Sequence, residues 1–265
     1  MALYFRWLAI PFLMLLSPCE AWASDTTPYA PTLLDAASTQ GILVERLSKA
    51  YLAIALNLEA KQTVQLSLAR QQFATQLSQL EQAKFAAEGQ ENYALLRQLW
   101  GDYQAMISLP PSMRQGKQLA ELSEELVWVS QKGYQSLLAK APLSNRLPHA
   151  AALRIAGLSQ RLAKLYLLKQ GGIRTAAINK DIDAATLEIK GLLTQIKPIA
   201  PRYAGMQDQL DLIQTQWLFF DLALRAQKAA TTQSERQAAL DVLSTSEHVY
   251  ALAHEVAATL SAQGQ

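Results

Sequence analysis

The sequence is poor in cysteine and in net charge. Its one cysteine is Cys19, so no disulfide bond can form within the chain, and cleavage beyond it would leave no thiol for metal binding or catalysis. The 24 basic residues nearly balance the 22 acidic ones, which leaves a net charge of +2. That balance argues against nucleic acid or a strongly anionic membrane as the partner.

Histidine is also scarce, and its placement gives little support to a metal site. His248 and His254 are six residues apart and fall on opposed faces of a helix, whereas a two-histidine zinc site needs a spacing of four. His149 is expected in a loop beside Pro148. The sequence contains no Glu-x-x-His pattern, no Gly-x-Ser-x-Gly motif and no glycine-rich phosphate loop. We therefore expect no metal, no cofactor and no catalysis.

The N-terminus is typical of a secretory signal. Arg6 supplies a positive charge, residues 7–16 form an apolar core, and Ala21-Trp22-Ala23 fits a small-x-small cleavage site. We expect cleavage after Ala23, so that residues 1–23 are a signal peptide and the mature chain is periplasmic. The alternatives are a lipid anchor at Cys19, which Pro18 disfavours, and a retained anchor, for which the apolar run is short.

The rest of the chain has the periodicity of helices. Apolar residues recur every three or four positions, as from Leu77 to Ala87, and no period-two stretch is sustained. Prolines and glycines break this pattern at Pro110-Pro111, Pro142, Pro148, Gly171-Gly172, Pro198 and Pro201. The breaks predict an all-α protein of eight helices in two groups of four, with residues 141–148 as the linker. The first interhelical turn must fall within the proline-free segment 33–87.

An internal repeat relates the two halves. Residues 43–52 align with residues 158–167, and six of the ten positions are identical. Further matches are Trp100 with Trp217, Tyr103 with Phe220, and Ser123-Glu124 with Ser246-Glu247. The repeat predicts a tandem duplication of a four-helix unit, the first copy within residues 24–141 and the second within residues 142–265.

Basic residues of the repeated segment allow more than one interpretation. Arg154, Arg161 and Lys164 share one helix face, so they could bind an anionic ligand or meet a facing protein. They could instead be solvated or form structural ion pairs inside each unit. The predicted pairs are Arg161 with Glu247 and Arg46 with Glu124.

The repeated aromatic residues are candidates for packing. Trp100 and Trp217 suit large anchors in the core, with the wall of a ligand site as the alternative. Tyr51 and Tyr166 are expected to pack with their rings while each hydroxyl reaches a polar partner.

The segment Ala156 to Leu167 resembles the opening helix of the PilJ-type sensor domain. That domain is the N-terminal part of type IV pili methyl-accepting chemotaxis transducers and is related to the nitrate/nitrite sensor domains of NarX-type kinases. The family pattern is approximately Ala-Gly-Arg-Gln-Arg-Met-Leu-Ser-Gln-Arg-Met-Ala-Lys-x-Tyr, which Ser159-Gln160-Arg161 and Lys164 follow here. The resemblance extends to the first repeat, where Val44 and Glu45 replace the serine and the glutamine.

The resemblance implies antiparallel four-helix bundles that sense small ligands in the periplasm. In NarX-type sensors, an arginine five residues before the motif's last arginine contacts nitrate, but Gly41 and Ala156 stand at those positions here. A nitrate site of that kind therefore lacks its charge. The remaining candidates for contact with a small anion are Arg46, Lys49, Arg154, Ser159, Gln160, Arg161 and Lys164.

These observations predict a periplasmic ligand-binding or sensory module with its pocket near the motif helices, between bundles or between protomers. No membrane-length apolar run follows Ser24, so we expect it to act through a membrane-bound kinase, transducer or transporter. The tandem repeat favours a monomeric pseudo-dimer over a homodimer. The alternative function is a non-catalytic scaffold or assembly protein that binds only other proteins.

Overall fold

The described part of the chain is entirely helical. A computed structural model describes residues 31–58, 61–85, 87–140, 146–225 and 232–262, and within these ranges there are eight α-helices, one 3₁₀-helix and no strand. The predicted all-α class is confirmed. The predicted signal peptide, residues 1–23, lies outside the described residues. Within the described ranges, no helix combines the length and apolarity needed to cross a membrane.

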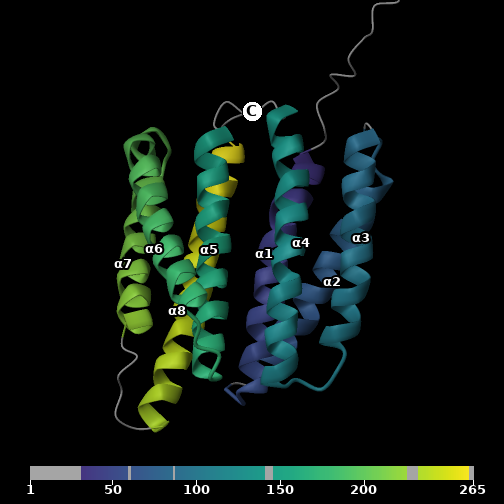
Figure 1. The fold of residues 1–265 in the computed structure, drawn as a ribbon. Coiled ribbons are helices and arrows are strands. Elements are labelled where there is room, and N and C mark those ends of the chain that lie inside the picture. Colours follow the sequence, from purple (N-terminus) through teal and green to yellow (C-terminus); the bar gives the residue numbers. More distant parts are fainter. Residues whose placement is uncertain (1–30, 59–60, 86, 141–145, 226–231, 263–265) are drawn as a thin grey trace, which may run out of the picture.

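The helices form two groups of four. Their bounds are α1 Pro31–Ala55, α2 Lys61–Gln82, α3 Ala87–Ile107, α4 Met113–Lys140, α5 Arg146–Gln170, α6 Ala176–Ile196, η1 Lys197–Arg202, α7 Met206–Arg225 and α8 Thr232–Ala262. In the first group, α1 packs on α2 and α4, and α3 packs mainly on α4; in the second, α5 packs on α6 and α8, and α7 packs on α8. Figure 1 shows the groups side by side, and contact between α1 and α5 joins them.

Most helices end where the sequence indicates. Helix α3 ends before Pro110, and α4 begins after Ser112, whose hydroxyl accepts a hydrogen bond from the Gln115 amide at 3.3 Å. Helix α5 ends before Gly172, which has a φ of 88° that glycine adopts without strain. The first interhelical turn, which the sequence places within the proline-free segment 33–87, follows the end of α1. Asn57 lies in this turn and has a positive φ of 53°.

The predicted linker is shorter than expected. Pro148 and His149 lie in the first turns of α5, which begins at Arg146, and residues 141–145 fall outside the described ranges. Proline fits there because the first amides of a helix have no intrahelical partner. His149 is consequently a buried residue rather than a loop residue, and its Nδ1 lies 3.2 Å from the Tyr134 hydroxyl.

The repeated tryptophans pack in the two cores, as predicted. Trp100 is stacked against Tyr103 with ring centroids 5.8 Å apart, and it also contacts Phe73 at 4.1 Å. Trp217 meets Phe220 edge to face at 5.8 Å. Both indoles are buried, so each anchors its own helix group through aromatic packing.

The repeated tyrosines also match their prediction. The rings of Tyr51 and Tyr166 are fully buried. The Tyr51 hydroxyl donates to Gln115 Oε1 at 3.1 Å, and the Tyr166 hydroxyl accepts from Gln170 Nε2 at 2.9 Å. Each hydroxyl thus finds the partner that a buried phenol requires.

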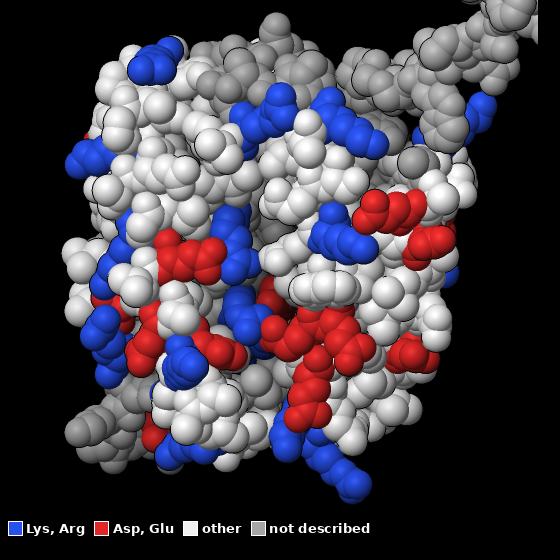
Figure 2. Space-filling view, turned by 45° about the horizontal axis from the view of Figure 1, so that its top comes forward, with Lys and Arg blue, Asp and Glu red and all other residues white. Residues whose placement is uncertain are grey.

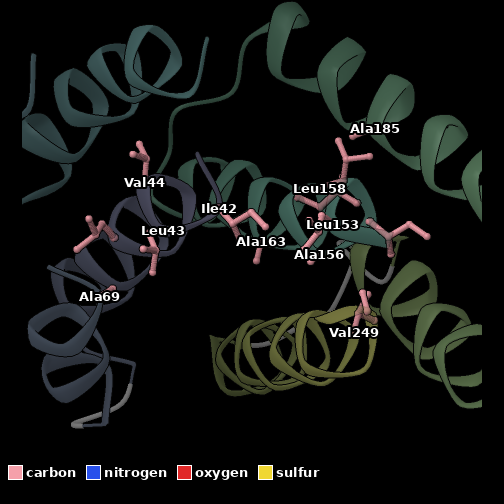
Figure 3. Packing of buried hydrophobic residues seen from close by; sticks show 14 of the residues in the cluster. Ile42, Leu43, Val44, Ala69, Leu153, Ala156, Leu158, Ala163, Ala185 and Val249 are labelled. Atoms are coloured by element: carbon pink, nitrogen blue, oxygen red, sulfur yellow. The ribbon is translucent and has the colours of Figure 1, made fainter. Parts of the chain in front are cut away.

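Small side chains let α1 and α5 approach one another. Figure 3 shows Ile42 of α1 facing α5 near Leu158 and Ala163. A Cβ atom added at Gly157 would lie 3.5 Å from Ile42 Cγ1, which is ordinary packing distance. Ala156 is fully buried, so an arginine at this position would place a charged group in the core, away from water. The small side chain of Ala156 therefore suits this closely packed position on α5.

Candidate functional site

Two clusters of charged side chains lie where the helix groups meet. We call them the Glu124 network and the Glu247 network. The Glu124 network contains Glu45 of α1, Ser123 and Glu124 of α4, Arg161 and Lys164 of α5, and Asp181 of α6. The Glu247 network contains Arg46 and Lys49 of α1, Gln160 of α5, and Ser246, Glu247 and Tyr250 of α8.

In the Glu124 network, two cations share three carboxylates. Arg161 Nη1 lies 2.5 Å from Glu124 Oε2 and 3.3 Å from Glu45 Oε1, and its Nη2 lies 3.4 Å from Asp181 Oδ2. Lys164, which is fully buried, donates to Glu124 Oε1 at 2.8 Å and to Ser123 Oγ at 3.0 Å. Its Nζ also lies 2.7 Å from Glu45 Oε2, an ion pair that is not aligned as a hydrogen bond.

In the Glu247 network, two cations share one carboxylate. Arg46 Nη2 donates to Glu247 Oε2 at 2.7 Å, and the Arg46 guanidinium lies 4.3 Å from the Tyr250 ring centroid, a cation–π contact. Lys49 forms an ion pair with the other oxygen of Glu247 and donates to Gln160 Oε1 at 2.6 Å. Gln160 in turn donates to the Ser246 carbonyl at 2.9 Å.

These ion pairs correct the predicted partners. The sequence predicts that Arg161 pairs with Glu247 and Arg46 with Glu124, each inside its own repeat. The structure exchanges them: Arg161 pairs with Glu124, and Arg46 pairs with Glu247. The exchange follows from the packing of α1 on α5, which turns the basic face of each motif helix toward the last helix of the other repeat. The two helix groups are therefore joined by buried ion pairs as well as by apolar contact.

Burial and charge pull the ionisable groups in different directions. Burial lowers the pKa of Lys49 to about 8, and the attraction of Glu247 offsets this effect only in part. Burial would raise the pKa of Glu247, but Lys49 and Arg46 outweigh it and the net pKa is lowered. Glu124 behaves in the same way, because Lys164 and Arg161 together lower its pKa despite burial. Both glutamates are thus held in the ionised form.

One aligned position accounts for much of the difference between the networks. Glu45 of the first repeat corresponds to Gln160 of the second, and each contacts the buried lysine of the other repeat. With Asp181 included, the Glu124 network has three carboxylates for two cations, whereas the Glu247 network has one carboxylate for two cations. The formal charges are therefore −1 and +1.

A groove of about 730 Å³ runs beside the Glu124 network. Its walls come from α1 and α4 of the first group and from α5 and α6 of the second, so it lies between the helix groups, beside the motif helices. We call it the central groove. Figure 2 shows acidic and basic side chains gathered where the two groups meet. The charged residues that line the groove are Glu45, Glu124, Arg154, Arg161, Asp181 and Glu188.

A second groove, of about 620 Å³, lies beside Arg46. Apart from Arg46 it is lined by α2 residues, and most of these are uncharged and polar: Gln65, Gln71, Gln72, Thr75, Gln76 and Gln79. We call it the α2 groove. It differs from the central groove because it has no carboxylate in its wall.

The structure separates the predicted anion-contact residues into two sets. Arg154 and Arg161 line the central groove, and Arg154 forms a bidentate pair with Glu188 at 2.6 and 2.9 Å, whereas Lys164 is fully buried in the Glu124 network. The other predicted residues, Arg46, Lys49, Ser159 and Gln160, lie in or against the Glu247 network. Four of the seven are buried and bonded to protein groups: Lys49, Ser159, Gln160 and Lys164.

Several residues of the site were not predicted from the sequence. The sequence marks Glu45 only as a departure from the PilJ-type pattern that it resembles, and it does not mark Asp181 or Glu188. The repeat alignment contains one signal for Glu45, because the carboxylate of Glu45 aligns with the uncharged amide of Gln160 in the second repeat. No comparable signal marks Asp181 or Glu188, because their role depends on how α6 packs beside α5.

Comparison with protein-family models, with curated proteins and with solved structures finds no match to this chain. In the part of the chain that the structure describes, no group of three or more histidine, cysteine, aspartate or glutamate side chains could hold a metal ion. The site is thus defined by its own geometry: two buried charge networks and a groove between two helix groups.

Proposed function

We propose that this chain is a periplasmic, non-catalytic sensory module made of two tandem antiparallel four-helix bundles of PilJ-like type. The internal repeat, the resemblance of its motif segment and the two matching groups of helices support this proposal. Residues 1–23 would be removed as a signal peptide. The contact between α1 and α5 brings the two motif helices together within one chain, which supports a pseudo-dimer.

The observation that carries the proposal is the central groove. Its volume of about 730 Å³ suits a small molecule, and its walls come from both helix groups. A ligand bound there would contact both groups and would favour the relative packing that it fits best. The module would pass that change to a membrane-bound kinase, transducer or transporter.

Thermal unfolding of the purified, processed protein tests this function. A panel of oxyanions, amino acids, amines and small organic acids would be scanned at several concentrations. A ligand at one hundred times its Kd adds about 2.7 kcal/mol, a shift of roughly 5–10 °C for a protein of this size. Saturable stabilisation that is lost on Arg154→Gln or Asp181→Asn would support the groove as the site. A flat response to every solute would count against a ligand-binding module.

A second candidate function, a scaffold that binds other proteins, is favoured by one surface feature. Helix α7 exposes a group of apolar side chains, each more than half exposed: Leu212, Leu218, Phe219 and Leu222. Exposed apolar patches are frequent at sites of protein association. In the first repeat, the positions equivalent to Leu218, Phe219 and Leu222 are Gly101, Asp102 and Ala105. The four-helix unit therefore does not need this apolar face for its own packing.

A further inference from the structure

We propose that the central groove binds a small organic cation, with an ammonium or guanidinium group placed at the exposed edges of Glu124 and Asp181 and beside the indole of Trp128. The proposal rests on the ligand-binding function proposed for this groove and adds the chemical class of the ligand.

The charge of the groove favours a cation. Its wall has four carboxylates and two guanidinium groups. Arg154 and Glu188 neutralise one another in a bidentate pair. Glu45, Glu124 and Asp181 remain, and among the described residues their cationic partners are Arg161 and the buried Lys164. One negative charge is left over, and a bound cation would balance it.

The two carboxylates that would receive the cation are accessible. The side chains of Glu124 and Asp181 are 45% and 46% exposed, and they approach the groove from α4 and α6 respectively. A single guanidinium, that of Arg161, lies within 3.4 Å of both. Because Arg161 already lies between them, a ligand ammonium or guanidinium would bind on the solvent side of Arg161, at the exposed edges of the two carboxylates.

An aromatic ring lies beside these carboxylates. Trp128 follows Glu124 by one helical turn on α4, lines the same groove and is 64% exposed. An indole face attracts organic cations, and it also covers the apolar part of such a ligand. Exposure of this large ring is otherwise costly, because its apolar surface remains in contact with water.

The inner wall of the groove offers an unpaired polar group. Ser130 of α4 lines the groove and is 2% exposed, and its hydroxyl has no hydrogen-bond partner. A buried hydroxyl normally has a partner, so a polar group on the ligand could supply the missing bond. Gly41 of α1 lies opposite, where an added Cβ atom would lie 3.6 Å from Ser130 Cβ, an ordinary packing distance.

An anion is a poorer fit for the same groove. Both guanidinium groups in its wall are already bonded to carboxylates, with Arg154 held by Glu188 and Arg161 by Glu124. An anion would have to displace a carboxylate from one of them and would then face the displaced charge at close range.

Isothermal titration calorimetry with a four-carbon series tests the charge preference. Putrescine is a dication, 1,4-butanediol is its neutral analogue and succinate is a dianion; agmatine and choline extend the cationic set, and nitrate extends the anionic set. The variants are Asp181→Asn and Trp128→Leu in the groove. Asp211→Asn is the matched control, because it removes the same charge from the exposed face of α7.

We expect at least one cation to bind saturably, with affinity reduced about tenfold by Asp181→Asn and unchanged by Asp211→Asn. Butanediol and succinate should not bind. If succinate, nitrate or butanediol binds instead and groove variants weaken it, the cation proposal is overturned while the ligand-binding function stands. If cations bind with equal affinity to Asp181→Asn and Asp211→Asn, the assignment to this groove is overturned. If no compound of any charge binds, both proposals fail.

Discussion

The Glu124 and Glu247 networks occupy equivalent places in the two repeats, yet they differ in charge and in access to solvent. Each contains an arginine and a buried lysine from one motif helix and a serine–glutamate pair from the last helix of the other repeat. The Glu124 network has surplus carboxylate and opens to the central groove. The Glu247 network has surplus cation and depends on a single carboxylate, which is only 22% exposed.

This difference shows which parts of a duplicated unit are free to diverge. The cations and the serine–glutamate pair hold the two helix groups together, and both copies keep them. The surrounding groups vary. Glu45 aligns with Gln160, and the acidic α6 wall of the central groove contrasts with the glutamine-rich wall of the α2 groove. Ion pairing between the helix groups therefore explains the residues that the two repeats share. Ligand preference depends on the residues in which the repeats differ.

The largest expected effect separates the two glutamates. Glu247→Gln leaves Lys49 and Arg46 without a carboxylate, so we expect the free energy of unfolding to fall by about 3–5 kcal/mol, as when one partner of a buried pair is removed. Glu124→Gln should cost about 1 kcal/mol, because Glu45 still pairs with Lys164 and Arg161 and the site is partly solvated. Urea unfolding of both variants measures the difference. Equal losses would mean that the networks are energetically alike.

The pH dependence of stability should reveal the burial of Lys49, which the single carboxylate of the Glu247 network offsets only in part. The pKa of Lys49 is about 8 in the folded protein and near its ordinary 10.5 in the unfolded chain. Between these values the unfolded chain binds one more proton, so this residue makes the free energy of unfolding rise with pH. The rise should approach about 1.4 kcal/mol per pH unit relative to Lys49→Met. Urea unfolding of both proteins from pH 7 to 10 tests this, and parallel curves would contradict it.

Gln160→Glu makes the Glu247 network resemble its counterpart. The new carboxylate would lie beside Lys49, so we expect the pKa of Lys49 to rise and its alkaline effect on stability to disappear. The net change in stability at pH 7 should stay within about 1 kcal/mol, because the substitution also loses the hydrogen bond from Gln160 Nε2 to the Ser246 carbonyl. The same pH series measures both effects. An unchanged alkaline slope would show that Gln160 does not control the charge of Lys49.

The sequence predicted the parts of this molecule that depend on local pattern. Periodicity and breaks predicted the helices, and the repeat identified Arg46 with Arg161 and Glu124 with Glu247 as equivalent residues. Because the copies are equivalent, the sequence could not distinguish pairing within a repeat from pairing between repeats. That choice depends on α1 packing against α5. The contributions of Asp181 and Glu188 to the groove depend in the same way on the position of α6.

The smallest expected effect on stability concerns the outer faces of α3 and α7, where the repeats also diverge. Phe219→Asp with Leu222→Ala installs the residues that the first repeat has at the equivalent positions, Asp102 and Ala105. Both replaced side chains are more than half exposed, so the free energy of unfolding should change by no more than about 0.5 kcal/mol. If the parent protein self-associates through this face, sedimentation velocity at increasing concentration should show less self-association for the variant than for the parent. Trp217→Ala, on the buried face of the same helix, is the contrasting control and should cost about 3–5 kcal/mol. A loss of 2 kcal/mol or more in the surface variant would mean that Phe219 and Leu222 stabilise the fold itself. This face of α7 could not then be assigned as a free surface for a partner.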